Sequence, residues 1–186
     1  MKALLVTAAL ALGTVIPAVA ETVTDWRWLE GTTWYVPTSG LPAYVYTPLT
    51  NTLISGPDQT VYTITGYRNG YFWGRTATSF NNEPATCKSL VGSVTPEGKV
   101  YLTFTNWPYT LGDIWTIGIG NMVKKNREWT MVNQMSTGGT VAQVGHWAYM
   151  LRTRQGQSSW NSLPGVNMSV PNFMQPCLAS APTVSQ

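Results

Sequence analysis

One histidine, His146, is the most obvious candidate for acid–base chemistry in this chain. It lies in the segment Gly145-His146-Trp147-Ala148-Tyr149, so Tyr149 is a second candidate for the same role. An imidazole can serve as a general base, but no Ser-containing nucleophile elbow precedes it, and the acidic residues fall mostly in predicted turns. The residues favour a structural or surface His146 and leave open a lyase, isomerase or cyclase.

Two asparagines are candidates for orienting a ligand. If residues 125–127 form a three-residue turn, Lys124 faces Glu128 as a favourable cross-strand charge pair. That register places Asn121 and Asn133 on one apolar face that we expect to point inward; its other members are Trp115, Ile117, Ile119, Val123, Trp129, Met131 and Met135. A buried amide without a partner costs about 1–3 kcal/mol. The two amides therefore either bond to each other, to backbone or to water, or hold the polar part of a ligand.

Arg75 is a third candidate, on a hairpin whose turn is Asn69-Gly70, the strongest two-residue turn signal in the chain. The predicted pairing puts Gly66 opposite Trp73 and Ile64 opposite Arg75. Hydrophobicity does not decide which face points inward. An inward Arg75 would suit a ligand carboxylate, whereas an outward Arg75 would be a solvated strand residue.

The two cysteines, Cys87 and Cys177, predict one disulfide if the protein folds in an oxidising compartment. The bridge would close a loop of about 90 residues, which the chain-entropy model values at roughly 4–5 kcal/mol. No His, Cys and carboxylate residues have metal-ligand spacing, and no motif indicates a cofactor.

The first twenty residues have the layout of a secretory signal peptide. Lys2 precedes an apolar stretch that is too short for a membrane span, and Ala18-Val19-Ala20 resembles a cleavage site. We therefore expect a secreted or periplasmic protein with a signal peptide at 1–20, a barrel domain at 21–154 and an irregular tail at 155–186.

The charge balance gives no indication of a nucleic acid partner. Without Lys2, the ten remaining basic residues face eight acidic ones, a net charge of +2 that is weak and scattered. Nine Trp and nine Tyr accompany a charged fraction of only 10%. The sequence does not indicate an oligomeric state.

Short β-branched and aromatic runs separated by Gly, Pro and Asn predict an all-β fold. Sequential hairpins favour an antiparallel up-and-down meander, and eight or nine strands can close into a barrel. The predicted strands are Thr32–Thr38, Tyr44–Tyr46, Val61–Tyr67, Tyr71–Ser79, Lys88–Thr95, Lys99–Asn106, Ile114–Lys124, Glu128–Thr137 and His146–Arg152.

The opening Trp28-Leu29-Glu30-Gly31-Thr32-Thr33-Trp34-Tyr35 resembles the Gly-x-Trp start of the calycins, the lipocalin and avidin-like barrels. The stretch from Glu128-Trp129-Thr130-Met131 to Val144-Gly145-His146-Trp147 is also similar to the late avidin strands. The resemblance implies a barrel in which the Trp of the first strand closes one end. It leaves the ligand open.

Three functions remain in competition. The leading one is binding of a small apolar or aromatic molecule inside the barrel; Asn121, Asn133 and Arg75 would orient it, and the walls would be Trp34, Trp115, Trp129 and Trp147. The second is the enzyme that uses His146. The third is an envelope module that binds carbohydrate or protein through exposed aromatics of Tyr71-Phe72-Trp73 and Trp107-Pro108-Tyr109.

Overall fold

The computed structural model describes residues 24–38, 42–108, 116–139 and 141–178. The predicted signal peptide, residues 1–20, and Trp115 lie outside this part of the chain. A 3₁₀ turn, η1 (Arg27–Leu29), precedes the strands. The strands are β1 (Thr33–Tyr35), β2 (Pro42–Thr47), β3 (Thr52–Arg68), β4 (Tyr71–Phe80), β5 (Thr86–Val94), β6 (Lys99–Asn106), β7 (Thr116–Lys125), β8 (Glu128–Thr137) and β9 (Gln143–Thr153). Three one-turn helices follow: α1 (Ser158–Asn161), α2 (Val170–Phe173) and α3 (Gln175–Leu178).

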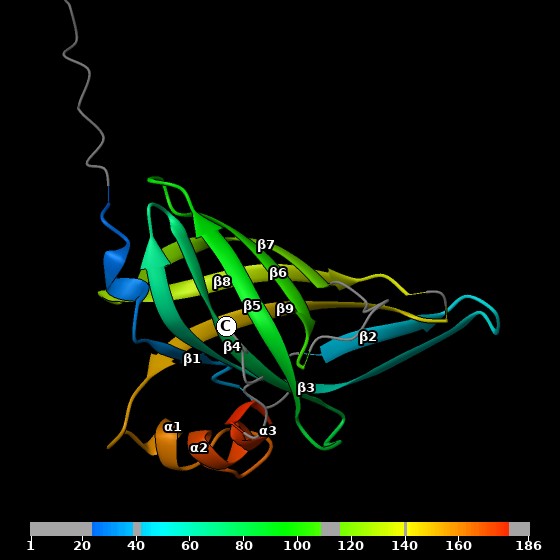
Figure 1. Ribbon diagram of the computed structural model, residues 1–186. Coiled ribbons are helices and arrows are strands. Elements are labelled where there is room, and N and C mark those ends of the chain that lie inside the picture. The colour runs from blue at the N-terminus through cyan, green and yellow to red at the C-terminus, as the bar shows by residue number, and fades with distance from the viewer. Residues whose placement is uncertain (1–23, 39–41, 109–115, 140, 179–186) are drawn as a thin grey trace, which may run out of the picture.

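The predicted all-β meander is confirmed: the strands form a closed eight-stranded antiparallel barrel with one extra strand (Figure 1). The barrel closes because β1 and β2 take the same place between β3 and β9. The short β1 pairs with Val61–Thr63 of β3 and with Leu151–Thr153 of β9. The strand β2 pairs further along the same two neighbours, at residues 52–57 and 143–146.

Strand β3 is much longer than the sequence predicts. Its second half pairs with β4 over Asp58–Arg68, while its first half pairs with β2 and extends beyond the barrel as a hairpin (Figure 1). The predicted strand begins only at Val61, whereas β3 begins at Thr52 and includes Gly56 and Pro57. Pro57 is tolerated because, among the described strands, β2 alone pairs with that half of β3.

The predicted register of the β7–β8 hairpin is wrong by one residue. The turn has two residues, Asn126 and Arg127, both with positive φ, so Lys125 rather than Lys124 pairs with Glu128. Such a turn matches the right-handed twist of the strands. The one-residue shift reverses the faces of β7: Ile117, Ile119, Asn121 and Val123 are exposed, while Thr116, Gly118, Gly120 and Met122 point inward.

Small residues on the inner face of β7 make room for large ones on its neighbours. A β-carbon at Gly118 would lie 3.1 Å from Leu102 Cβ, and one at Gly120 would collide with the side chain of Asn133. The hydrophobic pattern of β7 therefore misleads, because the barrel interior is limited by volume as well as by polarity.

The β3–β4 hairpin contains a β-bulge at Thr65. The predicted Gly66–Trp73 pair is confirmed, but beyond the bulge Ile64 faces Gly74 and Thr63 faces Arg75. Tyr62 and Thr76 point inward together, and Arg75 points outward, where its guanidinium lies 3.4 Å from the ring centre of Trp107.

Four tryptophans close the end of the barrel where η1 lies. Trp26 and Trp34 are buried, and Trp28 and Trp129 pack against them. Trp26 meets Trp129 edge-on with ring centres 4.9 Å apart, and Trp34 Nε1 donates to Thr32 Oγ1 at 2.8 Å. The expectation that a first-strand Trp closes one end agrees with this position of Trp34.

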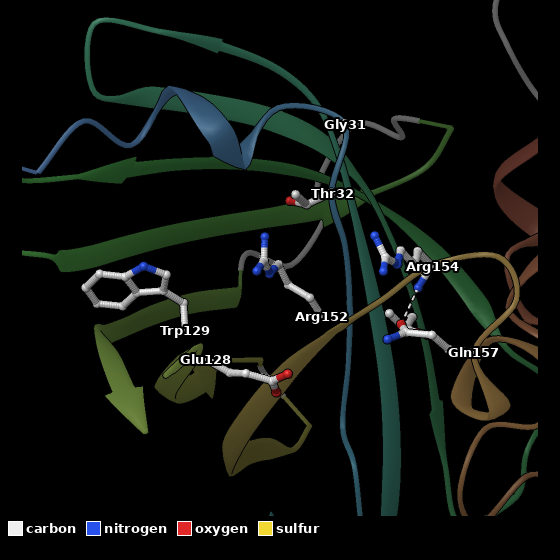
Figure 2. Close-up of a pocket in the computed structure, with 8 residues that line it drawn as sticks. Gly31, Thr32, Glu128, Trp129, Arg152, Arg154 and Gln157 are labelled. Carbon is white, nitrogen blue, oxygen red and sulfur yellow. Dashed lines mark hydrogen bonds between the residues drawn. The ribbon is translucent and has the colours of Figure 1, made fainter. Parts of the chain in front are cut away.

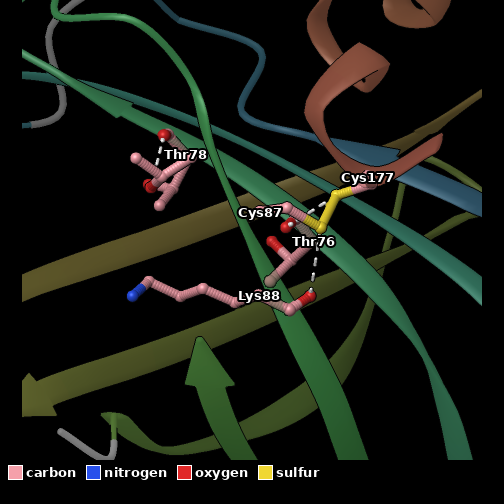
Figure 3. Close-up of a disulfide and its surroundings, with 6 residues drawn as sticks. Thr76, Thr78, Cys87, Lys88 and Cys177 are labelled. Atoms are coloured by element: carbon pink, nitrogen blue, oxygen red, sulfur yellow. Dashed lines mark hydrogen bonds between the residues drawn. A yellow bond between two sulfur atoms is a disulfide. The ribbon is translucent and has the colours of Figure 1, made fainter. Parts of the chain in front are cut away.

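The tail after β9 folds back onto the outside of β3, β4 and β5 (Figure 1). Leu163, Val170 and Phe173 bury there against Val61 and Ala77, which face away from the barrel interior. The predicted disulfide is confirmed: Cys87 of β5 is bonded to Cys177 of α3, with the Cα atoms 5.1 Å apart (Figure 3). No helix in the described residues is long and apolar enough to cross a membrane.

Candidate functional site

A cavity of about 230 Å³ occupies the barrel end opposite the tryptophans. We call it the mouth cavity. Its apolar wall comprises Ala43, Val45, Phe80, Phe104, Met135 and Val144. Its polar lining comprises Asp58, Thr60, Tyr62, Thr76, Thr78, Lys88, Thr116, Thr137 and His146.

Strand alternation brings the polar groups to one place. Asp58, Thr60 and Tyr62 are alternate residues of β3 and share its inner face. Thr76 pairs with Tyr62 and Thr78 pairs with Thr60, so two adjacent strands present hydroxyl groups side by side. His146 enters from β9, where its cross-strand partner is Met135 of β8.

The Asp58 carboxylate is held by two threonines. Its Oδ2 accepts from Thr60 Oγ1 at 2.9 Å, and its Oδ1 accepts from Thr78 Oγ1 at 3.2 Å. Only 8% of the side chain is exposed. The carboxylate is thus fixed in the wall of the cavity with its negative charge largely shielded from solvent.

His146 faces Asp58 without a hydrogen bond between them. Its Nε2 is 3.9 Å from Asp58 Oδ2, and among the described residues it has no hydrogen-bond partner. Burial lowers the pKa of His146 below its ordinary value, and the negative charge of Asp58 opposes this only in part. The imidazole is therefore neutral at pH 7, with a nitrogen directed at the gap between the two side chains.

Two further polar groups line the same cavity. Thr76 Oγ1 is buried and has no hydrogen-bond partner in the described chain. Lys88 brings a positive charge, and its Nζ donates to Asn106 Oδ1 at 2.9 Å. A buried polar group without a partner costs about 1–3 kcal/mol, so Thr76 and His146 each leave a binding interaction unused.

The floor of the mouth cavity separates it from the core. Tyr62, Phe104 and Met135 form this floor, and Tyr62 Oη donates to Met135 Sδ at 3.2 Å. Full burial raises the pKa of Tyr62 far above its ordinary value, so the phenol stays protonated. Asn133 lies one inward position deeper on β8, fully buried, and neither its Oδ1 nor its Nδ2 has a described partner.

The structure gathers only part of the sequence-predicted site. His146 lies at the mouth cavity, and Asn133 lies below its floor. Trp34 and Trp129 belong to the closed end. The expected inward position is wrong for Asn121 and Trp147, which are exposed on the outer face, and Tyr149 alternates with inward Ala148 and Met150.

Sequence reasoning missed Asp58, Thr60, Thr76, Thr78 and Lys88. The sequence predicts a turn at Asp58, whereas the structure places this residue inside β3. The signal that could have found the group is the alternation of Asp58, Thr60 and Tyr62 along one strand. This alternation indicates a shared inner face only once β3 is known to begin at Thr52, so that all three residues belong to one strand.

A second hollow, of about 330 Å³, lies at the tryptophan end (Figure 2). Its lining includes Glu128, Arg152 and Arg154, which are all exposed. Arg152 stacks on Trp28 at 4.9 Å, and the Arg154 backbone N–H donates to Gln157 Oε1 at 2.9 Å. None of the residues that line this hollow has a buried unpartnered polar side chain, so the mouth cavity is the stronger candidate.

The predicted exposed aromatic row is only partly formed. Tyr71 and Trp73 are exposed on the outer face, but Phe72 between them is buried in the core. Trp107 packs against the tail under Arg75, and Tyr109 lies outside the described residues.

The chain matches no protein-family model, no curated protein and no solved structure. The barrel agrees with the calycin-like architecture expected from the sequence, and that architecture carries no ligand or activity with it. Within the described residues, no group of three or more His, Cys, Asp and Glu side chains could hold a metal ion.

Proposed function

We propose that the protein binds a small hydroxylated aromatic molecule in the mouth cavity. The observation that carries the proposal is the presence of two buried, unpartnered polar atoms, His146 Nε2 and Thr76 Oγ1, in one cavity with apolar walls. Ligand pockets combine apolar walls with a few convergent polar groups, and the mouth cavity has this composition.

The size of the cavity supports a small ligand. Its 230 Å³ is below the range of about 300–1,000 Å³ that is usual for drug-sized ligands. Phe80 and Phe104 contribute aromatic side chains to the wall, and Val45 and Val144 contribute aliphatic ones. A single substituted ring suits these walls better than a long acyl chain.

The polarity of the cavity supports a hydroxyl donor. The Asp58 carboxylate can only accept hydrogen bonds, and a neutral His146 offers one accepting nitrogen. A phenolic O–H placed between Asp58 and His146 would donate to either one, whereas a ligand carboxylate at that position would be repelled by Asp58; Lys88 carries its positive charge elsewhere in the lining. The Thr76 hydroxyl can donate back to the ligand oxygen.

The proposal places this binding outside the cytoplasm. The signal-peptide layout of residues 1–20 supports it, and so does the Cys87–Cys177 disulfide, since such bonds persist in oxidising compartments.

Isothermal titration with phenol and 4-methylphenol tests the proposal. His146→Leu keeps a side chain of similar size without the accepting nitrogen, so the affinity for phenol should fall about tenfold, the value of one buried hydrogen bond. The matched control is Tyr149→Phe, which removes a hydroxyl from the outer face of the same strand and should leave the affinity unchanged. Equal affinities in wild type and His146→Leu would overturn the proposal.

A proton-transfer enzyme at the same site is the second candidate. The observation in its favour is that the neutral His146 faces the fixed Asp58 carboxylate in the lining of the mouth cavity. His146 would take a proton from a ligand carbon next to a carbonyl and return it to the same or a neighbouring atom, with Asp58 stabilising the imidazolium.

Exchange of α-protons in D₂O separates binding from catalysis. Wild type should speed the exchange in 4-hydroxyphenylacetone, monitored by proton NMR, and His146→Gln should abolish this effect. A protein that binds the compound without accelerating exchange is a binder and not such an enzyme.

A further inference from the structure

The carboxamide of Asn133 is fully buried, and neither its oxygen nor its nitrogen has a hydrogen-bond partner among the described residues. Its neighbours across the sheet are Gly120 on β7 and Ala148 on β9. Neither of these neighbours has a polar side chain that could meet the amide. Gly120 is needed there, because a β-carbon would collide with Asn133 Oδ1.

Met135 stands between this amide and the mouth cavity. It lines the floor of the cavity and is the next inward residue on β8 after Asn133. Its thioether accepts the Tyr62 hydroxyl, which is a weak hydrogen bond because sulfur is a weak acceptor. Methionine has three rotatable bonds and adapts its shape more easily than other apolar side chains.

We propose that Met135 is a gate and that the ligand reaches past it to Asn133 with a primary amide or a lactam. This inference rests on the proposed function, since the same molecule fills the mouth cavity with its hydroxylated ring. An amide places a donor beside an acceptor, and the Asn133 carboxamide presents the complementary pair. The swing of Met135 also exposes the Tyr62 hydroxyl as a donor for the ligand carbonyl.

The spacing along the strand gives an approximate length for the ligand. Successive inward residues of a strand are about 6.5–7 Å apart, and His146 pairs with Met135, one inward position above Asn133. An amide one methylene group away from a phenol ring, on the side opposite the hydroxyl, spans this distance. The probe is therefore 4-hydroxyphenylacetamide, and 4-isobutylphenol is its apolar counterpart of the same shape.

The experiment measures the dissociation constants of both probes and takes their ratio. In Asn133→Leu the preference for the amide over the alkyl probe should fall at least about tenfold relative to wild type, because both amide hydrogen bonds are lost. The matched control is Asn121→Leu, on the exposed outer face of β7, which should leave the ratio unchanged. An unchanged ratio in Asn133→Leu, as expected if a trapped water satisfies the amide, would overturn the inference.

Met135→Ala tests the gate independently of Asn133. Removing the gate should raise the affinity for 4-hydroxyphenylacetamide several-fold and leave that for phenol within about twofold. Equal changes for the two probes would contradict a gate. If phenol itself does not bind to wild type, the proposed function fails; if phenol binds but the amide preference does not depend on Asn133, only this inference fails.

Discussion

The two ends of the barrel differ in how their interior is filled. At the closed end, the rings of Trp26, Trp28, Trp34 and Trp129 fill the interior. The Trp34 indole has a hydrogen-bond partner, whereas the buried Trp26 indole N–H has none among the described residues. At the mouth, β3 and β9 present Asp58 and His146 to a cavity, and two polar atoms there, His146 Nε2 and Thr76 Oγ1, lack partners among the described residues. The difference is that packed rings fill the closed end, while the unpartnered polar atoms of the mouth line a cavity in which a ligand would meet them.

The largest effect is expected at the closed end. Trp34→Ala removes a fully buried indole and should lower the free energy of unfolding by about 3–5 kcal/mol. The matched control is Trp147→Ala, on the exposed outer face, which should change it by less than about 1 kcal/mol. Urea unfolding followed by circular dichroism measures both, and similar losses in the two variants would break the comparison.

The disulfide should stabilise the outside of the barrel without shaping its interior. Cys177→Ser releases the tail from β5 and should lower the free energy of unfolding by about 2–5 kcal/mol. Phenol affinity should persist, because Cys87 and Cys177 face away from the mouth cavity. Quantitative thiol labelling and titration calorimetry provide the readouts; two free thiols in unfolded wild type would rule the bridge out.

The pH dependence of stability should be concentrated at the mouth. Because burial lowers the pKa of His146, the unfolded chain takes up a proton before the folded one as the pH falls through about 6.5. The free energy of unfolding is therefore highest above this pH. It decreases as the pH falls from about 6.5 to the lower pKa that His146 has in the folded protein, and below that pKa His146 causes no further change.

NMR titration of the single histidine measures this shift directly. The midpoint in wild type should lie below 6.5. In Asp58→Asn it should fall further, since the negative charge that favours the imidazolium is gone. A midpoint at or above the ordinary value would show that the charge of Asp58 outweighs the effect of burial. It would contradict the proposed site, which uses a neutral His146 as a hydrogen-bond acceptor.

The smallest effect is expected from Thr76→Val. It replaces a buried hydroxyl that has no described partner with a methyl group of the same shape, so stability should rise by up to about 1 kcal/mol. Phenol affinity should decrease in the same variant. A loss of stability would show that the hydroxyl has a partner, such as a bound water, and would weaken the contrast between the two ends.

The sequence by itself determined the fold class, the disulfide and much of the strand order. Alternating β-branched and aromatic runs, Asn-Gly punctuation and two cysteines act locally or by simple pairing, so their consequences can be derived without coordinates. The same kind of reasoning singled out His146, because it is the only histidine.

Only the tertiary structure decided which faces line the interior. In β7 the glycines point inward because Leu102 and Asn133 occupy the space, and the isoleucines are left outside. Asp58 lies in the lining of the mouth cavity because β3 starts at Thr52 and pairs with β4 from Asp58 onward. Register and interior volume depend on all strands at once, and a shift of one residue in one turn exchanges the two faces of a strand.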